Sequence, residues 1–223
     1  MSVNKERELR SYQFEIRAEN SGEGISTLSG RPIVYDSPTD IGGWFREVID
    51  RGALDEADLT DVPLLVNHNR EMIPVARSRR NTPNSTLRLA VDTQGLMFDA
   101  DVDTANNMTS RELDSAVRRG DIDEMSFAFY VKSERWENLD SDYPTRHIEK
   151  ISKVGEISAV TWGAYKTTEI FARAKDALDN AKLALDNARS AANENNDSLE
   201  NEKRSKELEL EKAKFEALMK WSD

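Results

Sequence analysis

The sequence contains no cysteine and only two histidines, His68 and His147, among its 223 residues. Without cysteine there is no disulfide framework, no cysteine nucleophile and no thiolate metal site. Two imidazoles also leave little for a zinc site, which takes three or four protein ligands. We therefore expect no metal ion and no other cofactor, and any chemistry must use hydroxyl groups, carboxylates and these two rings.

Long apolar segments are lacking as well. No stretch approaches the roughly 18 uninterrupted apolar residues that a membrane-spanning helix needs. The opening residues, MSVNKERELR, do not contain the apolar segment of a secretory signal. We therefore expect a cytosolic protein without a membrane partner.

Positive charge is in deficit, because 31 lysines and arginines stand against 42 aspartates and glutamates, which gives a formal net charge of -11. An acidic protein repels a phosphate backbone, so we expect no nucleic-acid partner. The local cluster of Arg77, Arg79 and Arg80 does not change this expectation.

Glycine and proline are missing from the carboxyl-terminal part of the chain. The last glycine is Gly163 and the last proline is Pro144, so the residues that follow lack both helix breakers. We predict two parts, a strand-rich domain over residues 10–173 and a helical tail over residues 174–223.

The predicted tail contains an internal repeat, because ALDNAKL at 177–183 returns as ALDNARS at 184–190. Apolar residues recur there at alternating three- and four-residue steps, as in the seam of a coiled coil. The seam consists of Leu178, Ala181, Leu185, Ala188 and Ala192. Alanine buries little area, so we expect only marginal self-association through the tail. A solvated charged helix or a disordered linker remains an equal alternative.

Short alternating segments predict strands in the first part. Residues 87–102 alternate on both sides of a DTQG turn at 92–95, which predicts a hairpin. Thr109 and Glu112 form a possible capping box. Together with Gly120 as a helix end, they predict a helix near 110–119. Two further strands are predicted at 125–131 and 157–162. Because no long crossover connects these strands, we predict the α+β class with a mostly antiparallel β-barrel.

Ser126 is the first candidate for chemistry. It follows the acidic turn GDIDE at 120–124 and stands at the start of an otherwise apolar strand, where a hydroxyl is held rigidly and still meets solvent. A serine at the start of a strand is more often a hydrogen-bonded edge residue than a nucleophile, so its position alone does not decide the matter.

His68 is the second candidate, because it ends the apolar run PLLVNHN and a serine nucleophile needs a base that titrates near neutrality. A third group would orient the imidazole. Glu156, in VGEISAV, and His147, in TRHIEKI, are the two alternatives for it.

Four segments, in order, resemble the prohead serine proteases of tailed phages. They are GRPIVYDSPTDIGGWFREVIDRGALDEAD at 30–58, VPLLVNHN at 62–69, SAVRRGDIDEMSFAF at 115–129 and VGEISAVTWGAY at 154–165. The resemblance covers about residues 10–173. It implies His68 as the general base, Ser126 as the nucleophile and Glu156 as the orienting acid. It also implies a fold similar to the herpesvirus assembly protease, a mostly antiparallel barrel surrounded by helices. That enzyme uses a second histidine, which keeps His147 as the alternative third member.

The function that the resemblance implies is a serine endopeptidase of phage head maturation. The expected protein partner and substrate is the major capsid protein or the scaffold, cut inside the procapsid in the bacterial cytoplasm, together with self-cleavage. The tail then has the hypothetical role of carrying the protease into the assembling shell. The alternative is a catalytically inactive assembly scaffold that keeps the protease fold.

Overall fold

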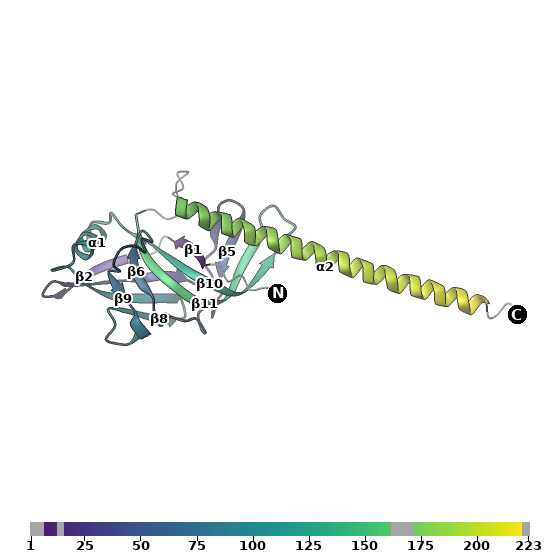
Figure 1. Cartoon of the computed structure of the whole chain (residues 1–223), viewed down its shortest axis with the longest axis horizontal. Helices are drawn as coiled ribbons and strands as arrows, with labels where there is room; N and C mark the ends of the chain where they lie inside the picture. The colour runs from purple at the N-terminus through teal and green to yellow at the C-terminus, as the bar shows by residue number, and fades with distance from the viewer. Residues whose placement is uncertain (1–6, 13–15, 162–171, 220–223) are drawn as a thin grey trace. The chain divides into compact units, whose positions relative to one another are not determined.

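The computed structural model describes residues 7–12, 16–161 and 172–219 (Figure 1). The chain divides into two compact units, residues 1–181 and 182–223. The elements of the first part are β1 (Arg7–Tyr12), β2 (Ile16–Gly22), β3 (Ile25–Val34), β4 (Thr39–Ile41), β5 (Phe45–Ile49), β6 (Pro63–Val66), β7 (Ala76–Arg77), the 3-10 helix η1 (Arg79–Asn81), β8 (Leu87–Asp92), β9 (Gly95–Asp103), α1 (Met108–Arg119), β10 (Glu124–Glu137) and β11 (Thr145–Val160). The helix α2 (Ala172–Met219) follows.

The strands form two sheets in a mixed α+β arrangement. One sheet has the order β1-β10-β11-β5-β4, with β6 paired to β11 and β7 paired to β6, and the other has the order β2-β3-β9-β8. Most pairings are antiparallel, but β11 pairs in parallel with both β5 and β6. Figure 1 shows β10 and β11, the two longest strands, running side by side.

The closed barrel expected from the sequence is not confirmed. The outer strands of the main path, β1 and β4, each pair on one side only, and no described strand joins the two sheets. Closure requires every strand to pair on both edges, so the described strands make two open sheets. The two parallel pairings, both at β11, are possible because the chain reaches β11 from β5 and β6 through long intervening segments.

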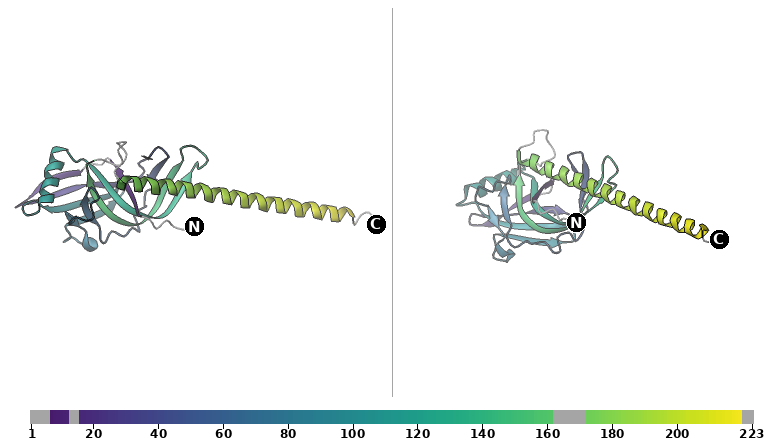
Figure 2. Two further views of the ribbon diagram at one scale, coloured as in Figure 1. Left: turned by 45° about the horizontal axis from the view of Figure 1, so that its top comes forward. Right: turned by 45° about the vertical axis from the view of Figure 1, so that its right-hand side comes forward.

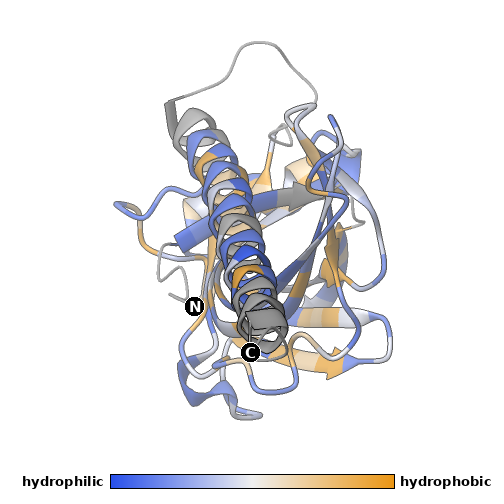
Figure 3. Cartoon of the chain, turned by 90° about the vertical axis from the view of Figure 1, so that its right-hand side faces the viewer, coloured by the Kyte–Doolittle hydropathy of each residue, from blue (hydrophilic) through white to orange (hydrophobic). Residues whose placement is uncertain are grey.

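One apolar core lies between the two sheets. Phe127 and Phe129 of β10 and Phe98 of β9 are almost completely buried and belong to the same cluster. Strand β10 is buried on both faces from Glu124 to Phe129. The face opposite Phe127 and Phe129 carries the small residues Ser126 and Ala128, and these are buried as well. Figure 3 shows the corresponding apolar bands along the strands of the body.

The local predictions for residues 87–120 agree well with the structure. Strands β8 and β9 form the expected hairpin, with Asp92 paired to Gly95 across the turn. Helix α1 begins two residues earlier than predicted, because Asn107 rather than Thr109 caps it by accepting a hydrogen bond from the Ser110 N–H.

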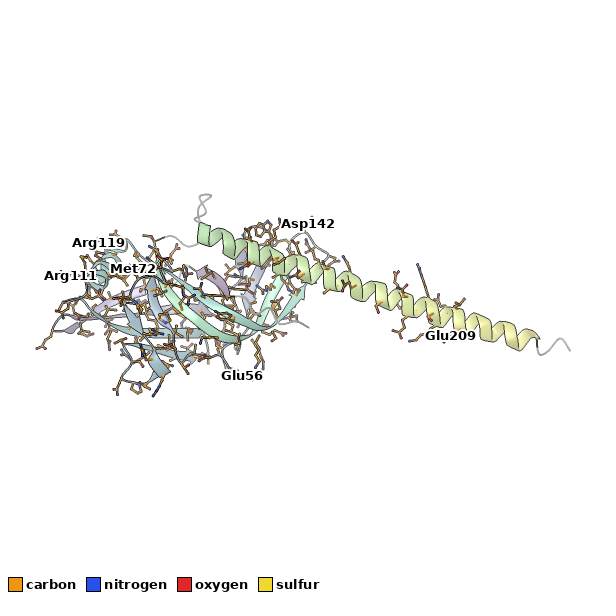
Figure 4. All side chains as sticks on the ribbon, viewed as in Figure 1. Glu56, Met72, Arg111, Arg119, Asp142 and Glu209 are labelled. Carbon is orange, nitrogen blue, oxygen red and sulfur yellow. The ribbon has the colours of Figure 1, made fainter. Side chains whose placement is uncertain are left out.

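Gly120 ends α1 in the left-handed conformation, as expected, with φ of 75°. The exposed face of α1 presents charged side chains such as Arg111 and Arg119 (Figure 4). The predicted last strand, 157–162, is the end of the much longer β11, and Trp162 lies outside the described residues.

Four charged side chains from β1, β5 and β11 are buried together. Arg10 donates to Glu47 at 2.7 Å and to Glu8 at 2.6 Å, and Arg146 donates to Glu8 at 2.6 Å. None of the four is more than 2 % exposed. Burial raises the pKa of Glu8, but Arg146 and Arg10 lower it by a larger amount, so the pKa is about 2. The network therefore holds the amino-terminal strand to the sheet by paired charges.

Helix α2 is a single helix of 48 residues, which agrees with the predicted helical tail. It is continuous in both views of Figure 2. Leu183 and Leu208 are half exposed, and the coloured part of the helix in Figure 3 is mostly polar. Pairing into a coiled coil is not confirmed. None of the described helices is long and apolar enough to span a membrane.

Candidate active site

Strand pairing brings the three sequence candidates to one end of the first sheet. Strand β6 runs parallel to β11, with Leu65 opposite Ser158, so both strands end on the same side. Strand β10 runs antiparallel to β11 and begins there, with Ser126 also opposite Ser158. His68 after β6, Ser126 at the start of β10 and Glu156 near the end of β11 therefore lie in one region of the sheet.

His68 and Glu156 are in direct contact. The Nδ1 atom of His68 lies 2.5 Å from Oε1 of Glu156, although the residues are 88 positions apart. The carboxylate is fully buried, whereas the imidazole is 15 % exposed. An ionised carboxylate only accepts hydrogen bonds, so Nδ1 carries the proton and Nε2 is the basic nitrogen. This is the arrangement of a histidine base held by an acidic residue.

Three further side chains lie near the Glu156 carboxylate. Arg7 of β1 forms an ion pair with Oε2, and Ser158 donates a hydrogen bond of 3.4 Å to Oε1. Arg70 is more distant, with its Nε 3.8 Å from Oε2. Burial raises the pKa of Glu156, but the hydrogen bond from His68 and the Arg7 guanidinium lower it below its usual value overall. The carboxylate is therefore ionised at neutral pH.

A left-handed turn directs His68 back towards β11. Asn67 and His68 have φ angles of 51° and 57°, a region that asparagine tolerates better than most residues. The Asn67 N–H donates to the Ala159 carbonyl at 2.9 Å. Its side-chain oxygen accepts from both the N–H and the hydroxyl of Thr161, at 3.0 and 2.9 Å. The end of β6 is thus tied to the end of β11.

Ser126 differs from the expectation in its exposure. Its side chain is completely buried, whereas the sequence suggested a hydroxyl that meets solvent. The hydroxyl donates to the Arg10 carbonyl oxygen on β1 at 2.8 Å instead of to an imidazole nitrogen. The reason is the pairing of β1 along β10, which sets Ser11 opposite Ser126 and covers this edge of the strand.

His147 lies elsewhere in the molecule. Its Nδ1 is 2.7 Å from Oδ1 of Asp50, and its Nε2 is 3.5 Å from Oε2 of Glu137. It precedes Glu156 on the same strand by nine residues, which corresponds to roughly 30 Å of strand length. The two alternatives for the third member are therefore at opposite ends of β11, and Glu156 is the one beside His68.

Sequence reasoning missed three residues of this site, Arg7, Asn67 and Ser158. Asn67 had a readable signal, because asparagine directly after a buried strand favours a left-handed turn. Arg7 and Ser158 had none, since their contacts depend on the pairing of strands that are distant in sequence. Among the described residues, no cluster of three or more histidine, aspartate or glutamate side chains is arranged to hold a metal ion.

Residues 12–182 match the family model of the caudovirus prohead serine protease. The match covers most of the chain and includes His68, Ser126 and Glu156. The chain belongs to the caudovirus prohead serine protease family. The resemblance found in the four sequence segments is thereby confirmed. No curated protein and no solved structure shows a significant match. Family membership identifies a serine peptidase fold, and the His68–Glu156 pair lies inside the region that defines this prohead protease family.

Proposed function

We propose that this member of the prohead protease family is an active serine endopeptidase with Ser126 as nucleophile, His68 as general base and Glu156 as the acid that orients it. The observation that supports this best is the contact of 2.5 Å between the His68 Nδ1 and the buried Glu156 carboxylate. A buried, ionised carboxylate is costly to maintain without partners, and one of its partners here is one of the two imidazoles in the chain.

In this mechanism the Nε2 atom of His68 takes the proton of the Ser126 hydroxyl. The oxygen attacks the scissile carbonyl carbon, and the imidazolium gives its proton to the leaving amine to form an acyl-enzyme. Water then attacks the ester. His68 takes a proton from the water and gives it to the Ser126 oxygen as the ester bond breaks. Glu156 stays ionised throughout and stabilises the imidazolium.

Ser126 must leave the Arg10 carbonyl before it reacts. A rotation about its χ1 angle to another staggered position would take the hydroxyl away from the Arg10 carbonyl. Nucleophile and base often approach each other closely only when substrate is bound. We therefore interpret the bond to Arg10 as the resting position of the hydroxyl.

The substrate that fits the family is the major capsid protein or the scaffold, cleaved inside the procapsid in the host cell during head maturation. Cleavage of the chain by itself belongs to the same proposal. The tail, residues 174–223, is proposed as the segment that carries the protease into the assembling shell.

A serine-directed fluorophosphonate probe tests the nucleophile on the full-length chain. We expect labelling of the wild type and of Ser110→Ala, and no labelling of Ser126→Ala. Ser110 is the matched control because its side chain is equally buried and it lies in α1, outside the site. Labelling of Ser126→Ala at the wild-type rate, or absence of labelling in the folded wild type, would refute the proposal.

Co-expression with a capsid protein and its scaffold tests the substrate. The wild-type chain should convert one of them into shorter fragments, which intact-mass spectrometry detects, and Ser126→Ala should leave both at full length. Identical fragments with both chains would contradict the proposed peptidase.

A further inference from the structure

We propose that Arg7, on the amino-terminal strand β1, is a positioning residue for the His68–Glu156 pair. The inference rests on the proposed function, because it assigns Arg7 a role in the same reaction. Arg7 acts through Glu156 and does not touch the reacting atoms. The sequence gives no hint of this role, since Arg7 is one of several charged residues in the polar segment NKERELR.

Strand pairing explains how Arg7 reaches the site. Strand β1 pairs with β10, with Arg7 opposite Tyr130, and β11 lies on the far side of β10. Side chains alternate along a strand, so Arg7 faces Glu156 while its neighbour Glu8 enters the buried charge network on the other face. The guanidinium therefore crosses β10 to form its ion pair with Glu156.

Small residues leave room for this crossing. Ala128 of β10 lies opposite Glu156, and Gly155 precedes Glu156 on β11. A Cβ atom at Gly155 would lie 3.4 Å from the Tyr130 ring, 3.6 Å from the Ala128 carbonyl and 3.8 Å from the Arg7 Nε. The path of the arginine is thus bounded by residues that have little or no side chain.

The two carboxylate oxygens of Glu156 have different partners, and Arg7 is the main partner of one of them. Oε1 is shared by His68 and Ser158, whereas Oε2 pairs with Arg7. The other cation near Oε2, Arg70, is 3.8 Å away on a side chain that is 66 % exposed. Without Arg7, Oε2 would remain buried with weak compensation, which favours rotation or protonation of the carboxylate. Either change would release the imidazole from its orientation.

The position of Arg7 is itself fixed by the charge network. Glu8 and Arg10, on either side of Leu9 in the same strand, are buried against Arg146 and Glu47. Arg7 is only 23 % exposed. A guanidinium held in this way loses little further freedom when it pairs with the carboxylate, which is a condition for precise positioning.

Two substitutions separate positioning from a general structural effect. Arg7→Gln removes the charge and keeps a hydrogen-bond donor, and Arg7→Lys keeps the charge and removes the planar fork. Arg31→Gln is the matched control, since Arg31 pairs with Asp92 in the other sheet and lies outside the site. Melting temperatures establish that all three variants fold.

The first readout is the rate of fluorophosphonate labelling at neutral pH. In Arg7→Gln we expect this rate to fall by about 10- to 100-fold, because the imidazole is less well placed. Arg7→Lys should restore part of the rate, and Arg31→Gln should match the wild type.

The second readout does not need activity. The chain has two histidines, so the NMR signals of the His68 ring nitrogens are identified by comparison with His147→Gln. We expect the signal of the His68 Nδ1–H, which faces Glu156, to shift in Arg7→Gln and to stay unchanged in Arg31→Gln. If the labelling rate and this signal are both unaffected by Arg7→Gln, the role of Arg7 is refuted and the proposed function stands. If the folded wild type is not labelled at all, the proposed function fails whatever the NMR spectra show.

Discussion

The side-chain oxygen of Asn67 accepts hydrogen bonds from both the backbone N–H and the hydroxyl of Thr161, at 3.0 and 2.9 Å. Asn67 directly precedes His68, and Thr161 directly follows β11, the strand that carries Glu156. The two bonds therefore join the turn of His68 to the end of that strand. The separation of the imidazole and the carboxylate therefore depends on a contact that includes neither of them.

Replacement of Asn67 should misplace His68. In Asn67→Ala both bonds to Thr161 are lost, at about 1 kcal/mol each, and the left-handed conformation costs about 1 kcal/mol more. We expect the free energy of unfolding to fall by about 2 to 3 kcal/mol and the labelling rate to fall by about 10- to 100-fold. Urea denaturation and probe labelling measure the two effects.

Asn67→Gly and Asn67→Asp are the controls for this prediction. Glycine relieves the backbone strain without restoring the bonds, so stability should recover in part while labelling stays slow. Aspartate restores the acceptor for Thr161, so labelling should recover. Equal labelling rates in Asn67→Gly and wild type would show that the bonds to Thr161 do not position His68.

The third member of the triad is tested by parallel substitutions of Glu156 and His147. Glu156→Gln should lower turnover by on the order of 10⁴, because the amide cannot stabilise the imidazolium. His68→Ala should cost on the order of 10⁴ to 10⁶. His147→Gln should change the rate only a few-fold, because His147 contacts Asp50 and Glu137 instead of His68. A loss in His147→Gln that equals the loss in Glu156→Gln would reverse the assignment.

Much of the local structure was predictable because it depends on short-range chemistry. The alternation around the DTQG turn predicts the hairpin β8–β9, and Gly120 predicts the end of α1. The apolar start of the run PLLVNHN, residues 63–66, forms β6. In each case the deciding residues are within a few positions of one another.

The arrangement of the sheets was not predictable in the same way. Parallel pairing of β11 with β5 and β6 brings together segments that are about a hundred residues apart, and no local pattern encodes it. The same holds for Arg7 and Ser158, which reach Glu156 only through strand order. The burial of Ser126 was missed because β1 had not been recognised as the strand that covers β10.

Loss of Arg146 should be strongly destabilising. Arg146 donates to Glu8 and Glu47, so Arg146→Met leaves these buried carboxylates with Arg10 as the remaining cation of the network. Breaking a buried ion pair by removing one partner costs about 3 to 5 kcal/mol. Urea denaturation should show a loss of this size.

The surface pair of Arg88 and Asp101 provides the contrast. The side chains of Arg88 and Asp101 are 34 % and 39 % exposed. Arg88→Met should therefore cost less than about 1 kcal/mol. If Arg146→Met is no more costly than Arg88→Met, the buried network does not hold β1 in place.

Glu8 should make stability depend on acid pH. Its pKa is about 2 in the folded chain, against an ordinary value of 4.5. The contribution of Glu8 to the free energy of unfolding is complete above the pKa that this group has in the unfolded chain. It is lost as the pH falls towards about 2, because the unfolded chain takes up the proton first. The difference in urea midpoint between wild type and Glu8→Gln should narrow as the pH falls from about 5 to about 3.

Glu112→Gln is the matched control for Glu8, since Glu112 is an exposed residue of α1. Its urea midpoint should follow that of the wild type over the same pH range. A constant difference between wild type and Glu8→Gln would show that the Glu8 carboxylate does not account for the acid sensitivity.

Truncation after Lys182 should separate catalysis from delivery. The family match ends at residue 182, and the second compact unit begins there. Deletion of residues 183–223 removes most of α2, including the buried side chains of Ala184 and Leu185, and keeps Ala181. We expect the probe-labelling rate of the truncated chain to equal that of the full chain, with a cooperative melting transition as evidence that it folds. Recovery in particles assembled with capsid protein should fall to background, because the tail is proposed to carry the protease into the shell. Normal packaging of the truncated chain, measured by mass spectrometry of purified particles, would assign delivery to the protease domain instead.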